Sequence, residues 1–161
     1  MDEMLALSAH LPKQVFEAGD SVVREGEPGG SIWVLEAGAL QVRKAGVVVN
    51  HITRPGAIVG EVSALLHCAY GATVVATERS VLHHAVNGPA LLDSHPAIAR
   101  LVAVGLAERL NYVTTYVADL KAQYAADVPG LHMVSAVLRE LSERQGERAR
   151  PGSARDPNPD Y

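Results

Sequence analysis

The stretch from Arg54 to Ala76 holds the residues whose types and spacing could do chemistry. Within it, Gly60 and Glu61 directly precede the apolar run 62–66, which is long enough for one to two helical turns. A glycine permits a backbone geometry or a close approach that a Cβ atom would block. The first N–H groups of a helix form a ready site for an anion such as a phosphate. A carboxylate would repel that anion, so Glu61 is expected to accept a hydrogen bond from another group, for example a sugar hydroxyl.

Short apolar runs separated by turn residues surround this stretch and must position it. The runs are Val22-Val23, Ser31–Leu35, Leu40–Arg43, Val47–Val49, His51-Ile52, Ala72–Ala76 and Ser80–Val86. Many short strands at this spacing are typical of an all-β sandwich or barrel. The 161 residues are 48% hydrophobic and carry a net charge of −4. This composition fits one globular domain and excludes a collagen-like or wholly disordered chain.

Beyond the strands the pattern becomes helical. Pro89 can open a short helix, and Ser94 is expected to be the N-cap of the next one, which has Pro96 in its first turn. Apolar residues then recur at alternating steps of four and three: Ala99, Ala103, Leu106, Leu110, Val113, Val117, Leu120 and Tyr124. A helix of about 30 residues is about 45 Å long. We therefore expect its distal half to pair with a second copy in a parallel homodimer, the alternative being a stripe that packs on the β-domain.

The order of these pieces resembles the cyclic-nucleotide-binding domain family, of the catabolite activator protein-like type. The resemblance covers about residues 16–125 and rests on Gly19-Asp20, Gly26, Trp33-Val34-Leu35, Gly38, Pro55-Gly56, Gly60-Glu61 and Ala72-Thr73-Val74. It implies a mainly β plus α fold, in which an eight-stranded antiparallel β-roll, or jelly roll, is followed by a long C-terminal helix. It also implies that the β-roll holds a short helix called the phosphate-binding cassette. Trp33 stands where the family often has an aromatic strand residue, which implies core packing.

The resemblance implies a role for each matching residue of the site. Glu61 stands where the family's glutamate accepts a hydrogen bond from the ribose 2′-hydroxyl. The positions whose backbone amides face the cyclic phosphate are Gly60, Val62, Ser63 and Ala64. Thr114 and Thr115 lie near the helix position where hydroxyls meet the purine, although plain polar surface is an equal interpretation. The implied ligand is cyclic AMP or cyclic GMP, with no catalytic residue and no metal.

Tyr70 departs from the family pattern. Alignment on Ala72-Thr73-Val74 puts Gly71 at a position for a small residue and Tyr70 where the family has an arginine. An arginine makes a charge-assisted, often bidentate contact worth about 1.5–3 kcal/mol, whereas a tyrosine donates one neutral hydrogen bond worth about 0.5–1.5 kcal/mol. Three outcomes remain open: weak cyclic-nucleotide binding, another cation in place of the arginine, or a changed ligand. A protonated His67 is one such cation, although an exposed loop histidine is the simpler interpretation.

The pattern predicts three segments: a β-roll with its dimerisation helix at 1–126, a short extra helix at 127–143 and a disordered tail at 144–161. Four arginines make the tail basic: Arg144, Arg148, Arg150 and Arg155. The resemblance would continue the chain into a winged helix-turn-helix. The residues after 143 are too few and too proline-rich for its recognition helix and wing, so direct DNA binding is not expected.

The cysteine and histidine content and the absence of long apolar runs limit the cellular location and the kinds of enzyme that the sequence can be. The single cysteine, Cys68, forms no internal disulfide and fits a reducing compartment. The N-terminus has no signal-peptide pattern and no later run is apolar enough for a membrane span, so we expect a cytoplasmic protein. His83 and His84 are adjacent and would point to opposite faces of a strand, and no metal-ligand spacing is present. A cupin-type enzyme is therefore disfavoured, and we expect no enzyme.

Two functions remain. The first is a cyclic-nucleotide-binding-like sensor that signals through its C-terminal helix. The second is a ligand-free dimerisation or partner-binding module with a degenerate pocket.

Overall fold

The computed structural model describes residues 3–123 and residue 136. The chain divides into two compact units, Met1–Val104 and Gly105–Tyr161, and each is described by itself. Apart from residue 136, the short helix predicted at 127–143 and the tail predicted at 144–161 lie outside the described residues. The segment boundaries expected from the sequence therefore stay predictions.

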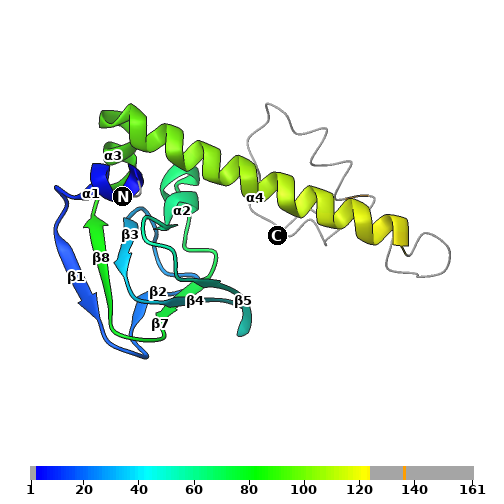
Figure 1. Ribbon diagram of the computed structural model, residues 1–161, viewed down its shortest axis with the longest axis horizontal. Helices are drawn as coiled ribbons and strands as arrows, with labels where there is room; N and C mark the ends of the chain where they lie inside the picture. Colours follow the sequence, from blue (N-terminus) through cyan, green and yellow to red (C-terminus); the bar gives the residue numbers. More distant parts are fainter. Residues whose placement is uncertain (1–2, 124–135, 137–161) are drawn as a thin grey trace. The chain divides into compact units, whose positions relative to one another are not determined.

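Antiparallel strands of the first unit form two four-stranded sheets (Figure 1). The strands are β1 (Lys13–Phe16), β2 (Ser21–Val23), β3 (Ile32–Ala37), β4 (Leu40–Lys44), β5 (Val47–Ile52), β6 (Ile58–Val59), β7 (Thr73–Ala76) and β8 (Ser80–Ala85). One sheet has the order β1-β8-β3-β6 and the other the order β2-β7-β4-β5. The runs predicted separately at 47–49 and 51–52 form one strand, whose pairing with β4 contains a register shift.

Four helices complete the described structure: α1 (Glu3–Ser8), α2 (Glu61–Leu66), α3 (Gly88–Ser94) and α4 (Pro96–Gln123). Eight strands in two sheets followed by a long helix confirm the predicted fold class. Asn87 is the N-cap of α3, and its side chain accepts a hydrogen bond from the Ala90 amide at 3.1 Å. The predicted N-cap role of Ser94 is wrong. Ser94 ends α3 and its hydroxyl donates to the Ala90 carbonyl at 2.7 Å, while the carbonyl of His95 accepts from the Ala99 amide.

Apolar side chains from both sheets fill the interior of the β-roll. Along β3, Trp33 and Leu35 belong to this interior, whereas Ile32 and Val34 are buried on the opposite face of the strand. The buried cluster consists of Phe16, Val22, Val23, Trp33, Leu35, Leu40, Val59, Val74, Ala76 and Leu82. Burial of one large apolar side chain contributes about 1.5–3 kcal/mol. This cluster therefore holds together the two sheets that carry α2.

The two adjacent histidines of β8 face opposite sides of the strand, as the alternation predicts. His83 is 2% exposed, and its Nδ1 lies 2.8 Å from the Ser8 hydroxyl of α1. Its Nε2 lies 3.1 Å from a carboxylate oxygen of Glu36, which also pairs with Lys13 at 2.8 Å. The hydrogen bond from Lys13 is the main cause that lowers the pKa of Glu36. These contacts connect α1 to β1, β3 and β8.

His84 stacks in parallel on Trp33, with ring centroids 3.6 Å apart. Phe16 meets the same indole edge-on at 5.5 Å, so Trp33 is a core residue, as expected. Within the described chain, Trp33 Nε1 and His84 Nε2 are buried polar atoms without a hydrogen-bond partner. Burial lowers the pKa of His84 below 6.5, because the imidazolium would lose its hydration.

Stability is expected to fall as the pH drops through 6.5, because the unfolded chain then binds a proton at His84 that the folded chain does not. A His84→Phe variant keeps the stack on Trp33 and should show a shallower loss between about pH 7.5 and 5.5. Urea unfolding across this range measures the effect. The exposed His51 offers a control, since His51→Gln should keep the slope of the natural chain. Superimposable pH profiles of His84→Phe and the natural chain would contradict this assignment.

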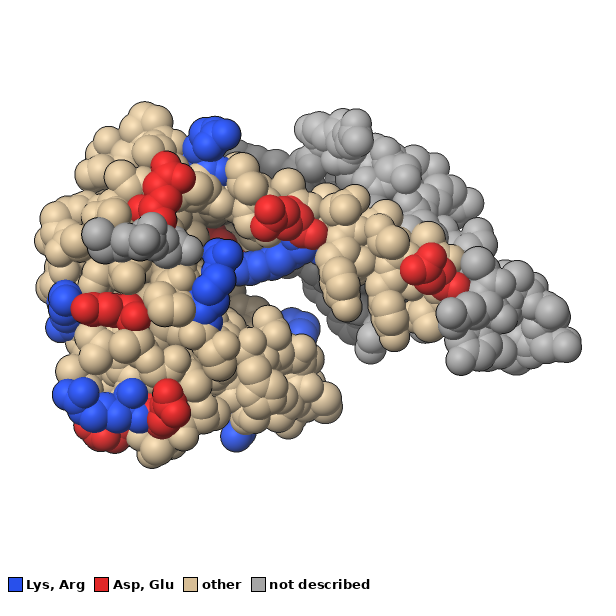
Figure 2. All heavy atoms as spheres, viewed as in Figure 1, with Lys and Arg blue, Asp and Glu red and all other residues tan. Residues whose placement is uncertain are grey.

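Acidic and basic residues are interspersed on the face of the first unit seen in Figure 2. That face therefore has no extended stripe of one sign. Among the described residues, no helix by itself has both the length and the apolar character of a membrane span. Taken together, α3 and the part of α4 up to Leu120 have the length and the apolar composition of such a span, although the two helices are bent by 112° where they meet.

Candidate functional site

Gly60 sets the backbone at the start of α2. Its φ of 92° lies in the left-handed region that favours glycine. A Cβ atom at this position would overlap the carbonyl oxygen of Ser31. The Gly60 carbonyl accepts the first helical hydrogen bond, from the Ala64 amide at 3.1 Å. The glycine that the sequence singled out is therefore required both by conformation and by space.

Glu61 is the first residue of α2 and is 5% exposed, together with the buried Ser63 and Ala64. Val62, between them, is 44% exposed. A buried carboxylate at this place is an acceptor for a hydroxyl or a cation. The structure therefore brings the predicted residues together at α2, with Gly60 as the N-cap, residues 61–64 in the helix, the carboxylate turned inward and Val62 turned outward.

Tyr70 lies beside the start of α2. Its ring carbon Cε1 is 3.4 Å from the position that a Cβ atom of Gly60 would take. The ring is half-buried and packs on the interior cluster, as do Val42, Ile52 and Ala57. Two hydrogen bonds fix its backbone: the Tyr70 carbonyl accepts from the Gly26 amide at 2.9 Å, and the Tyr70 amide donates to the Glu27 carbonyl at 3.0 Å. Gly71 and Ala72, exposed and half-buried respectively, lead from this ring into β7.

Lys44 is a residue of this region that the sequence analysis did not single out. Its ammonium donates to the Gly71 carbonyl at 2.7 Å and lies 4.0 Å from a carboxylate oxygen of Glu25. Lys44 could have been found only from the pairing register of β4 with β7, in which Arg43 lies opposite Thr73. Lys44 follows Arg43 and therefore ends β4 next to the loop that holds Gly71.

His67 and Cys68 line a different part of the surface. They border an open groove of about 680 Å³ with Ser63, Asn87 and Pro89, and Tyr70 is not among the residues that line it. His67 has a φ of 52° and forms the C-cap of α2. Cys68 is a free, exposed thiol. Within the described part of the chain, no group of three or more histidine, cysteine or acidic side chains is arranged to hold a metal ion.

A chain of hydrogen bonds links the start of α2 to the start of α3. The Ser63 hydroxyl donates to the Gly60 carbonyl at 2.8 Å and accepts from the Gly30 amide at 3.2 Å. The Gly30 carbonyl in turn accepts from the Gly88 amide at 2.7 Å. A Cβ atom on Gly88 would lie only 2.5 Å from that carbonyl oxygen. Small residues thus keep these segments in close contact.

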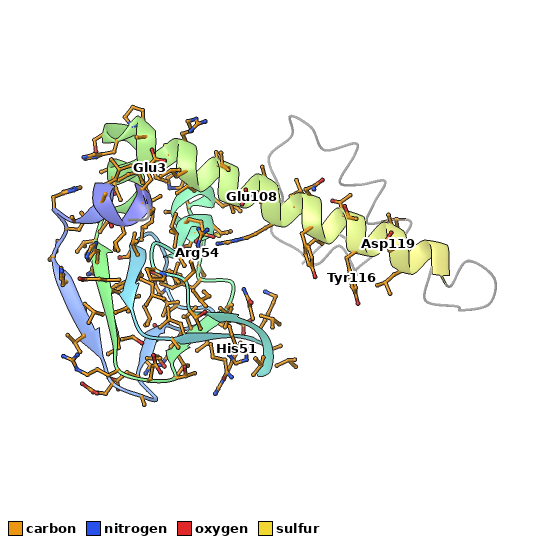
Figure 3. All side chains as sticks on the ribbon, viewed as in Figure 1. Glu3, His51, Arg54, Glu108, Tyr116 and Asp119 are labelled. Carbon is orange, nitrogen blue, oxygen red and sulfur yellow. The ribbon has the colours of Figure 1, made fainter. Side chains whose placement is uncertain are left out.

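Thr114 and Thr115 belong to the part of α4 in the second unit, where Thr114 is half-buried and Thr115 exposed. Large apolar side chains are exposed on the same part of the helix, and Tyr116 projects from it (Figure 3). They are Leu110 (53%), Tyr112 (73%), Val113 (50%) and Tyr116 (56%). Leu110 and Val113 are two members of the predicted a/d seam.

Comparison with known proteins assigns the class. Residues 13–87 match the family model for the cyclic nucleotide-binding domain. Over 72 residues the chain is 33% identical to the cAMP-dependent protein kinase regulatory subunit of Yarrowia lipolytica, covering 45% of this chain and 19% of the relative. Over 59 residues it is 39% identical to the cGMP-dependent protein kinase egl-4 of Caenorhabditis elegans, covering 37% of this chain and 7% of that kinase. The match spans less than a fifth of the length of each of these relatives.

Solved structures share the fold at lower sequence identity. The catabolite activator protein of Thermus thermophilus superposes with a TM-score of 0.63 and 22% identity, over 91% of this chain and 70% of that one. A regulatory subunit of a cAMP-independent protein kinase A from Trypanosoma brucei superposes with a TM-score of 0.54 and 23% identity. The superposition covers 65% of this chain and 40% of that one. In sequence, residues 13–87 are similar to the cyclic nucleotide-binding domain family. The fold around them is the catabolite activator protein-like β-roll with its long helix.

Proposed function

We propose that this protein is a regulatory sensor module that binds a cyclic nucleotide, cyclic AMP or cyclic GMP, at α2. Glu61 accepts a hydrogen bond from the ribose 2′-hydroxyl, and the amides of residues 60, 62 and 63 face the cyclic phosphate. The Ala64 amide, expected from the sequence to face it too, instead donates to the Gly60 carbonyl at 3.1 Å. The observation that carries this proposal is the family match over residues 13–87, which includes the whole of α2 and Tyr70. The kinase relatives named for cAMP and cGMP dependence support a nucleotide of this kind.

The local geometry supports the assignment of Glu61. Glu61 is 5% exposed and begins α2, within the residues that match the family model. A ribose hydroxyl is a partner of the right chemistry, because it donates to an acceptor-only group. Tyr70 contributes at most a neutral hydrogen bond, so the affinity of the natural chain is expected to be low.

Replacement of Glu61 by glutamine should weaken cyclic AMP or cyclic GMP binding at least tenfold, because a charge-assisted hydrogen bond becomes a neutral one. Isothermal titration calorimetry measures the change. Glu78→Gln, at an exposed residue between β7 and β8, is a matched control that should bind like the natural chain. Circular dichroism must show that Glu61→Gln is folded. Equal affinities of a folded Glu61→Gln variant and the natural chain would show that the nucleotide does not use this carboxylate.

A second candidate function is a ligand-free module with a degenerate pocket, which acts through dimerisation or a protein partner. Two observations favour it. Tyr70 packs its ring on the interior of the β-roll at the arginine position, and the fold is shared with a protein kinase A regulatory subunit described as cAMP-independent. Calorimetry separates the candidates, since this module gives no binding heat with either nucleotide, even after Tyr70→Arg.

The output of the sensor is proposed to run through α4. The exposed apolar side chains of its distal part, which include Leu110, Val113 and Tyr116, suit pairing with a second copy or with a protein partner. Homodimer formation, a cytoplasmic location and the absence of direct DNA binding stay predictions.

A further inference from the structure

An anionic ligand at the start of α2 would meet a neutral Tyr70 where a cation is favourable. In the first unit, the cations to consider are those whose charged groups reach the residues around Tyr70. His67 lines the groove on another side of α2, and its imidazole carries a charge only when protonated. Arg54, labelled in Figure 3, lies in the loop between β5 and β6, and its carbonyl accepts from the Ala57 amide at 3.1 Å. Lys44 contacts the segment after Tyr70 directly.

The position of Lys44 follows from the way in which successive side chains of β4 point to opposite faces of the sheet. Leu40 and Val42 turn toward the interior cluster, and Lys44 is the next residue on that face. Because it is the last residue of the strand, its side chain extends past the apolar interior to the rim of the sheet. There its ammonium donates to the Gly71 carbonyl at 2.7 Å, one residue from Tyr70. It is also the atom nearest to the place of a Cβ atom on Gly71, at 3.9 Å.

The ammonium of Lys44 is available to a ligand. The side chain is 63% exposed, and an ammonium group has three donors, of which the Gly71 carbonyl takes one. The Glu25 carboxylate lies 4.0 Å away, at the limit of an ion pair, while its other oxygen accepts from the Ala45 amide at 2.8 Å. A phosphate could therefore bind Lys44 without breaking the hydrogen bond that holds Glu25.

We propose that Lys44 supplies the positive charge for the phosphate of the bound cyclic nucleotide, in place of the arginine that this chain lacks at position 70. The inference rests on the proposed function, since it names a residue of the same binding site. It predicts that affinity depends on a residue of β4 rather than on α2 alone. Because the ammonium is exposed, this contribution is screened by salt.

Lys44→Met keeps the aliphatic stem and removes the charge. It is expected to weaken cyclic AMP or cyclic GMP binding about tenfold at low ionic strength, and to flatten the salt dependence of the affinity. Lys44→Arg should restore most of the affinity. Two matched controls are Arg43→Met, whose side chain bonds Gln41 on the outer face, and Arg54→Met. Calorimetric titrations at low and high salt give all these affinities.

The outcomes separate this inference from the proposed function. Loss of affinity in Lys44→Met that exceeds the loss in both controls supports the inference. Binding by the natural chain that is unaffected in Lys44→Met, or that is lost only in Arg54→Met, overturns it and leaves the sensor function standing. Absence of binding in the natural chain, in Lys44→Met and in Tyr70→Arg overturns the sensor function itself.

Discussion

A Tyr70→Arg variant is expected to bind cyclic AMP or cyclic GMP about tenfold more tightly than the natural chain. The substitution replaces one neutral hydrogen bond by a charge-assisted, bidentate contact, a difference of about 1–2 kcal/mol, and 1.4 kcal/mol is a factor of ten. The geometry permits it, because the ring of Tyr70 is half-buried beside Gly60. The aliphatic stem of an arginine can cover the same apolar surface while its guanidinium reaches the ligand.

Calorimetric titration of the variant and the natural chain with both nucleotides measures this gain. Val15→Arg, on the exposed side of β1, adds the same charge elsewhere and should leave the affinity unchanged. The Lys44→Met substitution should cost less affinity in the Tyr70→Arg background than in the natural chain. The reason is that the new guanidinium then supplies the positive charge. A folded Tyr70→Arg variant with no gain for either nucleotide would argue for the degenerate pocket.

The second large effect is expected at Gly60. Gly60→Ala should destabilise the fold by about 2–5 kcal/mol, since two costs add. An L-residue in the left-handed region costs about 1–2 kcal/mol, and the new Cβ atom overlaps the Ser31 carbonyl oxygen, which is backbone and cannot rotate away. The movement that relieves this overlap shifts the start of α2, so nucleotide binding should be lost as well.

Two further glycines separate the cost of the left-handed backbone from the cost of the overlapping Cβ atom. Gly26 has a φ of +82° with open space around its Cβ position, so Gly26→Ala should cost only about 1 kcal/mol. Gly71 is not in the left-handed region and its nearest neighbour is the flexible Lys44 ammonium, so Gly71→Ala should change stability by less than about 0.5 kcal/mol. Urea unfolding of the three variants gives the order directly. A Gly60→Ala variant no less stable than Gly26→Ala would show that the Ser31 carbonyl can move away from the new Cβ atom at little cost.

The strands and the start of α2 could be predicted from sequence because their signals are local, whereas the β-roll was implied by the family resemblance. Alternating apolar residues and turn glycines identify the strands, and Gly60 with Glu61 identifies the start of α2. Lys44 could not be found this way, since its contact with Gly71 depends on the pairing of β4 with β7. Ser94 failed as an N-cap because a serine hydroxyl can equally donate to the carbonyl four residues before it in a helix.

The short hydrogen bonds from Gly60 through Ser63 and Gly30 to Gly88 tie the start of α2 to the start of α3. Separation of the two ends would break a hydrogen bond of this chain, and a side chain larger than glycine at position 88 would push them apart. One residue separates α3 from α4, so in the proposed sensor the path from α2 to the long helix would run through α3 alone.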